Sequence, residues 1–169
     1  MKNKKILISI IALFVMLTIA VPTFAATITT PGSQEVTVTY QVGVSYTVSI
    51  PADFTLTSED QTNYTAEETV SATGVLIEAG KTLNVKMKST NFADGEYKLK
   101  DSSGESKIKY TIKNGEQDFT NDTTVLTVEA GTTEEAETTL KFATTAEEIG
   151  KATKSGDHTD TLTFTVSVD

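Results

Sequence analysis

The 169-residue sequence has no cysteine, no tryptophan, no arginine and a single histidine. Without cysteine it has no disulfide scaffold, thiolate nucleophile, cysteine-ligated zinc site or iron–sulfur cluster. Without arginine, and with 14 lysines against 23 acidic residues, it lacks the basic patches that nucleic acids and anionic membranes require. The composition therefore excludes several partners and chemistries before any motif is considered.

Threonine is the residue in excess, with 32 occurrences, about one residue in five. β-Branched residues favour strands, and no stretch shows convincing helical periodicity over three turns. The length and the absence of a linker indicate one domain. The acidic, threonine-rich composition thus favours an all-β domain.

The first 25 residues match the three-part pattern of a secretory signal peptide. Lysines at positions 2, 4 and 5 precede an uncharged run from Ile6 to Val21, and small residues follow at Thr23 and Ala25. The apolar run is shorter than the ~20 residues that a membrane span needs, so a retained anchor is the weaker alternative. We predict cleavage after Ala25, leaving residues 26–169 as one secreted domain with a flexible segment at 26–34 and no membrane contact. Lack of cysteine in a secreted protein is typical of Gram-positive bacteria.

Apolar and polar residues alternate through most of the remaining chain, which predicts strands with one buried face. The longest run, Val36 to Ile50, is long for one strand, and we expect a bend or bulge at Gly43 that divides it. Asp94-Gly95 and Asn114-Gly115 are dipeptides of tight hairpin turns. The other segments are expected as follows: strands around 54–56, 68–77, 83–87, 97–99, 108–112, 124–129, 138–143 and 158–168, a loop at 58–65, and one helical turn at 146–151.

Nine or ten short strands with frequent turns predict an antiparallel β-sandwich, with a closed barrel as the alternative. The hairpin expected at Asp94-Gly95 would pair residues 83–87 with 97–99. Tyr40, Tyr46, Tyr97 and Tyr110 lie in the apolar phase and are expected in the core, whereas Tyr64 lies in the predicted loop. With no tryptophan and most tyrosines assigned to the core, a sugar-binding platform is unsupported.

Two segments, GVLIEAGKTLNVK at 74–86 and SGDHTDTLTFTVS at 155–167, resemble small secreted Ig-like β-sandwich surface proteins of Firmicutes. The second is also similar to the final strand of bacterial pilin-like and spore-coat-like subunits, whose Gly-x-Tyr-x-Asp-Thr pattern has His158 here in place of tyrosine. The resemblance implies an Ig-like sandwich at the cell surface, engaged in assembly or adhesion. It transfers no catalytic residue.

Candidate chemistry is sparse. A nucleophilic serine or threonine would need a base such as His158, but the Gly-x-Ser-x-Gly elbow is missing, and we expect His158 to be a solvated residue at a strand start. Carboxylates flank several loops, yet the Asp-x-Asp-x-Asp-Gly calcium loop is absent as well. We therefore predict no catalytic residue, no metal site and no cofactor, and the protein is not expected to be an enzyme.

Two functions remain. The first is a secreted, non-enzymatic structural or adhesive subunit of the cell surface or matrix, which binds protein partners or itself. Here the alternating run at 36–50, preceded by a flexible segment, could add as a strand to a neighbour's sheet. The alternative is a monomeric secreted binding module or inhibitor that acts through loops such as Ser58 to Thr65.

Overall fold

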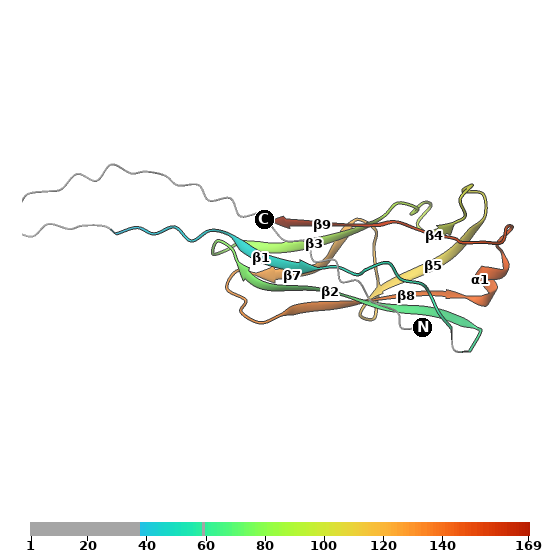
Figure 1. The fold of residues 1–169 in the computed structure, drawn as a ribbon, viewed down its shortest axis with the longest axis horizontal. Helices are drawn as coiled ribbons and strands as arrows, with labels where there is room; N and C mark the ends of the chain where they lie inside the picture. The colour runs from blue at the N-terminus through green and yellow to red at the C-terminus, as the bar shows by residue number, and fades with distance from the viewer. Residues whose placement is uncertain (1–37, 59) are drawn as a thin grey trace, which may run out of the picture.

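Two antiparallel sheets packed face to face make up the fold in the computed structural model, which describes residues 38–58 and 60–169 (Figure 1). One sheet has the strand order β1-β2-β8-β5-β4, with β6 paired to β5, and the other has the order β7-β3-β9. The strands of the described residues are β1 (Ser45–Ser49), β2 (Asn63–Leu76), β3 (Thr82–Ser89), β4 (Tyr97–Lys100), β5 (Lys107–Asn114), β6 (Gln117–Asp118), β7 (Thr123–Glu129), β8 (Ala136–Thr145) and β9 (Leu162–Val168). The prediction of an all-β antiparallel sandwich is confirmed.

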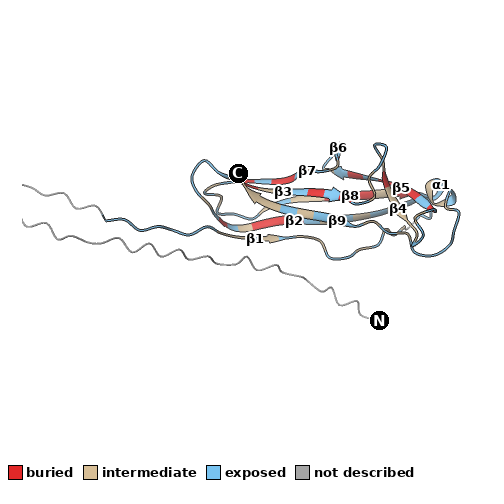
Figure 2. Cartoon of the chain, turned by 90° about the horizontal axis from the view of Figure 1, so that it is seen from above, coloured by how far each residue is buried: buried red, intermediate tan, exposed pale blue. Residues whose placement is uncertain are grey.

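The core lies between the sheets and follows the period-two pattern of the sequence (Figure 2). In β3, Leu83, Val85 and Met87 are fully buried, while Lys86 and Lys88 at alternate positions are exposed. Leu140 and Phe142 of β8 meet them from the wider sheet and are also buried. Because adjacent residues of a strand face opposite sides, the alternation selects the core side chains of β3, whereas consecutive residues such as Val125 and Leu126 of β7 are both buried.

The Asp94-Gly95 turn forms as predicted, but the strands around it do not pair with each other. Both residues have positive φ, 58° and 79°, and Ala93 and Glu96 exchange backbone hydrogen bonds of 3.0 and 3.1 Å across the turn. However, β3 pairs with β7 and β9, whereas β4 pairs with β5. The expected hairpin between 83–87 and 97–99 is therefore wrong, because the chain crosses from one sheet to the other between residues 89 and 97.

The helical turn and the second hairpin agree with the sequence-based predictions. Helix α1 (Ala146–Gly150) begins after Thr145, whose hydroxyl accepts the backbone N–H of Glu148 and so caps the helix. The turn at Asn114-Gly115 connects β5 to β6, with Gly115 at φ 61°. Both features depend only on residues close together in the sequence, so local sequence patterns can predict them.

The edge formed by β1 differs from the prediction. The bulge expected at Gly43 lies instead in β2 at Gly74, where φ is 60° and the register with β1 shifts by one residue. Residues 38–44 belong to no strand, so among the described residues of the long alternating run Ser45–Ser49 alone is in a sheet. The strand expected at 54–56 is also absent, because those residues have no sheet partner; a single isolated bridge, from Thr57 to Thr65, lies nearby among the described residues.

The predicted signal peptide at 1–25 and the segment at 26–34 lie outside the described residues. Among the described residues, no helix is both long enough and apolar enough to span a membrane.

Truncating a core leucine tests the burial pattern. We expect Leu140→Ala to lower the free energy of unfolding by about 3 kcal/mol, because it removes a fully buried side chain and leaves a cavity. The matched control is Leu76→Ala in β2. Leu76 is 48% exposed, so this substitution should lower the free energy of unfolding by only about 0.5 kcal/mol. Urea unfolding of the two variants measures the difference, and equal costs would contradict the core assignment.

Candidate functional site

The most unusual surface feature is the extended segment Val38–Val44 that precedes β1. Its apolar side chains occupy alternate positions, and Val38, Tyr40, Val42 and Val44 are 91, 87, 61 and 53% exposed. The sequence pattern is that of a half-buried strand, yet no side chain of the segment joins the core cluster. The described structure thus leaves a strand-like apolar face without a covering partner, and Tyr40, expected in the core, lies on that face.

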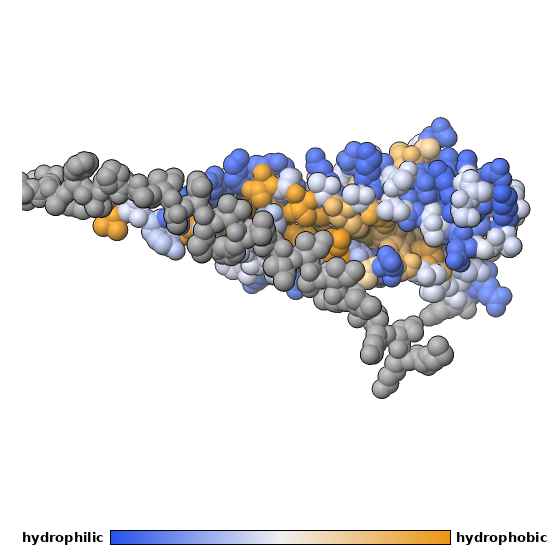
Figure 3. Space-filling view, turned by 45° about the horizontal axis from the view of Figure 1, so that its top comes forward, coloured by the Kyte–Doolittle hydropathy of each residue, from blue (hydrophilic) through white to orange (hydrophobic). Residues whose placement is uncertain are grey.

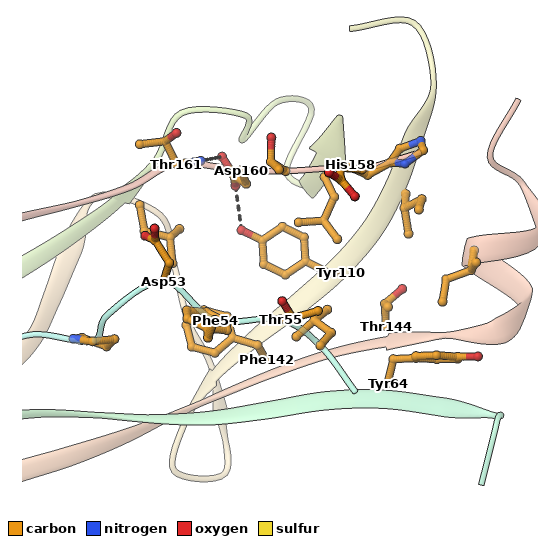
Figure 4. A pocket seen from close by; sticks show the side chains of 18 of the residues that line it. Asp53, Phe54, Thr55, Tyr64, Tyr110, Phe142, Thr144, His158, Asp160 and Thr161 are labelled. Atoms are coloured by element: carbon orange, nitrogen blue, oxygen red, sulfur yellow. Dashed lines mark hydrogen bonds between the residues drawn. The ribbon is translucent and has the colours of Figure 1, made fainter. Parts of the chain in front are cut away.

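A cleft of about 840 Å³, lined by both apolar and polar side chains, lies between residues 51–56 and the start of β9 (Figure 4). Phe54 and Phe142 meet in its floor with ring centroids 4.8 Å apart and an interplanar angle of 49°. The ring of Tyr110 stands beside them, and Tyr64 of β2 lies toward the opposite end. Tyr64 is half-buried in a strand, not in a loop as predicted.

Asp160 forms the polar rim of this cleft and connects three parts of the fold. Its carboxylate accepts the hydroxyl protons of Ser89 (2.5 Å) and Tyr110 (2.6 Å), and the backbone N–H groups of Asn91 (3.1 Å) and Thr161 (2.7 Å). These bonds attach the approach to β9 both to the end of β3 and to β5 of the other sheet. A carboxylate with four donors fixes their relative positions through charge-assisted hydrogen bonds, which are stronger than neutral ones.

The tyrosines beside Asp160 stay protonated over a wide pH range. Burial, together with the nearby Asp160 carboxylate, raises the pKa of Tyr97 to about 12. Burial and the hydrogen bond to Asp160 raise the pKa of Tyr110 still further. Each phenol therefore acts as a donor: Tyr110 to Asp160, and Tyr97 to the backbone carbonyl of Phe119 at 3.1 Å.

His158 contacts a serine, but the arrangement is structural. Its Nδ1 lies 3.0 Å from the carbonyl oxygen of Gly156, and its Nε2 lies 2.8 Å from Ser106 Oγ. Because a carbonyl only accepts, Nδ1 carries the proton of the neutral ring and Nε2 accepts from the serine hydroxyl. Ser106 is fully buried, and its oxygen also accepts the backbone N–H groups of Thr153 and Lys154. Because this hydroxyl is buried, the pair fastens residues 153–158 to the body. His158, predicted to be solvated, is partly exposed, but both of its ring nitrogens are engaged in contacts within the fold.

Asp101 organises the loop that presents Ser106. Its carboxylate accepts the hydroxyl of Ser103 (2.5 Å) and the backbone N–H groups of Ser106 (2.9 Å) and Ser103 (3.3 Å). These bonds, the Ser103 hydroxyl above all, and the nearby Lys154 ammonium lower the pKa of Asp101 to about 2. The loop is therefore tied to the ionised form of this carboxyl.

Among the described residues, no three or more histidine, aspartate or glutamate side chains lie close enough together to hold a metal ion.

Two of the five tyrosines, Tyr97 and Tyr110, are buried as expected, and Tyr46 packs partly buried against the core. The final-strand pattern includes Asp160 as its aspartate, but it gives no contact for that residue and no sign of the cleft. The partners of Asp160 in β3 and β5 lie 50 or more residues away in sequence.

No protein-family model matches this chain, and no curated protein matches it either. Among solved structures, a chain from work on a chaperone–tip adhesin complex in the biogenesis of CFA/I fimbriae aligns at 14% identity and a TM-score of 0.48. The alignment covers 72% of this chain but 41% of the other, so this chain spans less than half of that neighbour's length. At that similarity nothing about the function of this chain follows from the neighbour.

Removing the Asp160 carboxylate tests its role as a connector. We expect Asp160→Ala to lower the free energy of unfolding by about 3 kcal/mol, because it leaves the Tyr110 and Ser89 hydroxyls without their acceptor. Asp157→Ala, at an exposed position on the same cleft, is the matched control and should change stability little. Chemical denaturation of both variants gives the comparison; a cost for Asp160→Ala no greater than that of the control would contradict this role.

Acid should weaken the loop held by Asp101. Its pKa is about 2 in the folded protein against an ordinary value of 3.8, so its contribution is present above pH 4 and is lost as the pH falls from 4 to 2. Thermal melts of the wild type and Asp101→Asn at a series of pH values measure this. The wild-type advantage should be largest above pH 4 and shrink towards pH 2. A gap that stays constant over that range would show that the ionised carboxylate is not what stabilises the loop.

Proposed function

We propose that this protein is a secreted, non-enzymatic structural or adhesive subunit of the cell surface or extracellular matrix that assembles by β-strand addition. The observation that carries the proposal is the exposed alternating segment Val38–Val44. Four apolar side chains on one face are accessible to water, next to a strand that already belongs to the sandwich.

An isolated strand of this kind has little to stabilise it in water. Ordering its backbone costs about 1–2 kcal/mol per residue, and with no neighbour it gains neither ladder hydrogen bonds nor apolar burial. Added to the edge of another sheet, the same segment gains both: main-chain bonds supply affinity and alternate side chains supply specificity. Burial of each valine or tyrosine contributes about 1.5–3 kcal/mol.

The location of the segment agrees with such a role. If the signal peptide is cleaved as predicted, Val38–Val44 lies near the new N-terminus, where it is free to reach a neighbouring molecule. The strand that follows, β1, is anchored by Tyr46 and Val48, which pack against the core. The segment is therefore presented by a fixed base, and losing it would leave the sandwich itself intact.

A monomeric binding module acting through its loops is the second candidate. In the loop before β2, Asp60 accepts the backbone N–H groups of Thr62 (2.8 Å) and Asn63 (2.9 Å) and the hydroxyl of Ser58 (3.0 Å). These bonds, the one from Asn63 first, hold the pKa of Asp60 well below its usual range. A loop fixed in one conformation is pre-organised for a partner, which favours this alternative if the protein does not assemble.

Charge placed on the apolar face of the segment tests the proposal. We expect the double variant Tyr40→Asp with Val42→Asp to weaken self-association about a hundredfold, because two side chains that would be buried, worth roughly 3 kcal/mol together, become charged. Its melting temperature as a monomer should stay at the wild-type value, since these residues lie outside the core. Size-exclusion chromatography with light scattering, over a range of concentrations and at low and high salt, measures assembly.

The matched control carries the same two charges on the other face, as Thr39→Asp with Gln41→Asp. It should assemble far better than the apolar-face variant. High salt should favour assembly throughout, because the chain has a formal charge of −9 and copies repel one another. A wild-type protein that remains monomeric at all concentrations and salts, or an apolar-face variant that assembles normally, would contradict the proposal and favour the binding module.

A further inference from the structure

The narrower sheet has an open edge at β9. Within the described residues β9 pairs with β3 alone, so the backbone groups along its other side have no sheet partner. Its inward residues Leu162, Phe164 and Val166 are only partly buried, whereas those of β3 beside it are fully buried. The sandwich is therefore incompletely covered along β9.

A second unpaired stretch faces this edge across the cleft. Residues 51–56 lie in no sheet ladder, although Phe54 and Leu56 point inward and contact the core. Between them and the start of β9, the cleft of about 840 Å³ has an aromatic floor that includes Phe142. Apolar side chains are gathered in a band along this face of the molecule (Figure 3). Unpaired backbone beside an apolar floor is the environment that an added strand requires.

The segment Val38–Val44 has the matching pattern. Its apolar residues recur at every second position and so lie on one face when the segment is extended. It contains no charged residue, which lets it approach an acidic body without direct repulsion. When extended, the segment is about 24 Å long, at ~3.4 Å per residue. This length matches that of β9, which also has seven residues.

The segment and the cleft lie at opposite ends of the same copy. The segment leaves the body at the end where β9 terminates, whereas α1, β4 and the beginning of β9 lie at the other end (Figure 1). The cleft is lined by residues of that second end, among them Ile149 and Leu99. Because the segment continues directly into β1 at Ser45, it would have to reverse direction without an intervening loop to reach its own cleft.

We infer that the occupant of the cleft is the Val38–Val44 segment of a second copy, which adds as a strand along the free edge of β9. This inference rests on the proposed function, and it identifies the edge of β9 as the surface that accepts the added strand. Donor and acceptor are different surfaces, so the contact is heterologous, and repetition links the copies head to tail, in an open chain unless the rotation between copies closes a ring.

Disulfide trapping tests the acceptor directly, because the natural chain has no cysteine. One copy carries Thr39→Cys or Gln41→Cys, on the outward face of the segment. A second copy, distinguished by a small tag, carries Thr163→Cys or Thr165→Cys, on the outward face of β9. All four positions are exposed, so the substitutions leave the core untouched. The control acceptor is Thr124→Cys, an exposed threonine on β7 at the opposite edge of the same sheet.

We expect about tenfold more mixed disulfide with β9 than with the β7 control, because only neighbouring strands bring Cα atoms to about 5.5 Å. The favoured cysteine pair also gives the register and direction of the added strand. Suppose that assembly depends on Tyr40 and Val42, but that trapping at β9 is absent or no greater than at the β7 control. That result would overturn β9 as the acceptor and leave the proposed function standing. A protein that does not assemble would overturn both.

The last arm identifies the occupant. A single chain with both Thr39→Cys and Thr163→Cys, oxidised at high dilution, should remain uncrosslinked as a monomer. Efficient closure within one chain would show that each copy fills its own cleft, and would overturn the assignment to a second copy.

Discussion

The hydrogen-bonding requirement of the strand backbone, combined with sheets of unequal width, is the constraint on which the rest of this structure depends. A strand inside a sheet satisfies its N–H and C=O groups on both sides, whereas an outer strand satisfies one side only. Here a sheet with five strands in its main path faces a sheet of three. The narrower sheet cannot cover all of the wider one, and the uncovered part becomes the cleft beside β9.

The polar contacts around that cleft hold its shape. Asp160 joins the approach to β9 to both sheets, and Ser106 with His158 secures the loop before it. The donors and acceptors of both contacts are paired within the fold. Their effect is to keep the opening from collapsing, which a less restrained edge would do to bury Phe54 and Phe164 more completely. A pre-shaped opening binds a strand at lower entropic cost than one that must first be formed.

Sequence patterns predicted what depends on neighbouring residues. Alternation located β3, β5 and β9, and the Asp94-Gly95 dipeptide located a tight turn with both residues at positive φ. The same alternation did not predict that Val38–Val44 would stay outside the sandwich. Alternation shows that one face of a segment is suited to burial, but it does not identify the surface that covers that face. The turn dipeptide likewise says nothing about which sheet each flanking strand joins. That choice depends on partners such as Thr82–Ser89 with Leu162–Val168, about 80 residues apart, and the cleft is built from equally distant pieces.

The exposed segment also has a consequence for the lifetime of single molecules. Extended backbone outside any sheet is the conformation that proteases bind and cut, whereas ladder-paired strands resist them. A copy that has not joined a neighbour is thus most vulnerable at residues 38–44, and cutting there spares the sandwich. If copies assemble as proposed, such a clipped copy keeps its cleft but has no segment to offer. It would accept a neighbour and pass nothing on, so proteolysis would set the length of the chains as well as remove unassembled material.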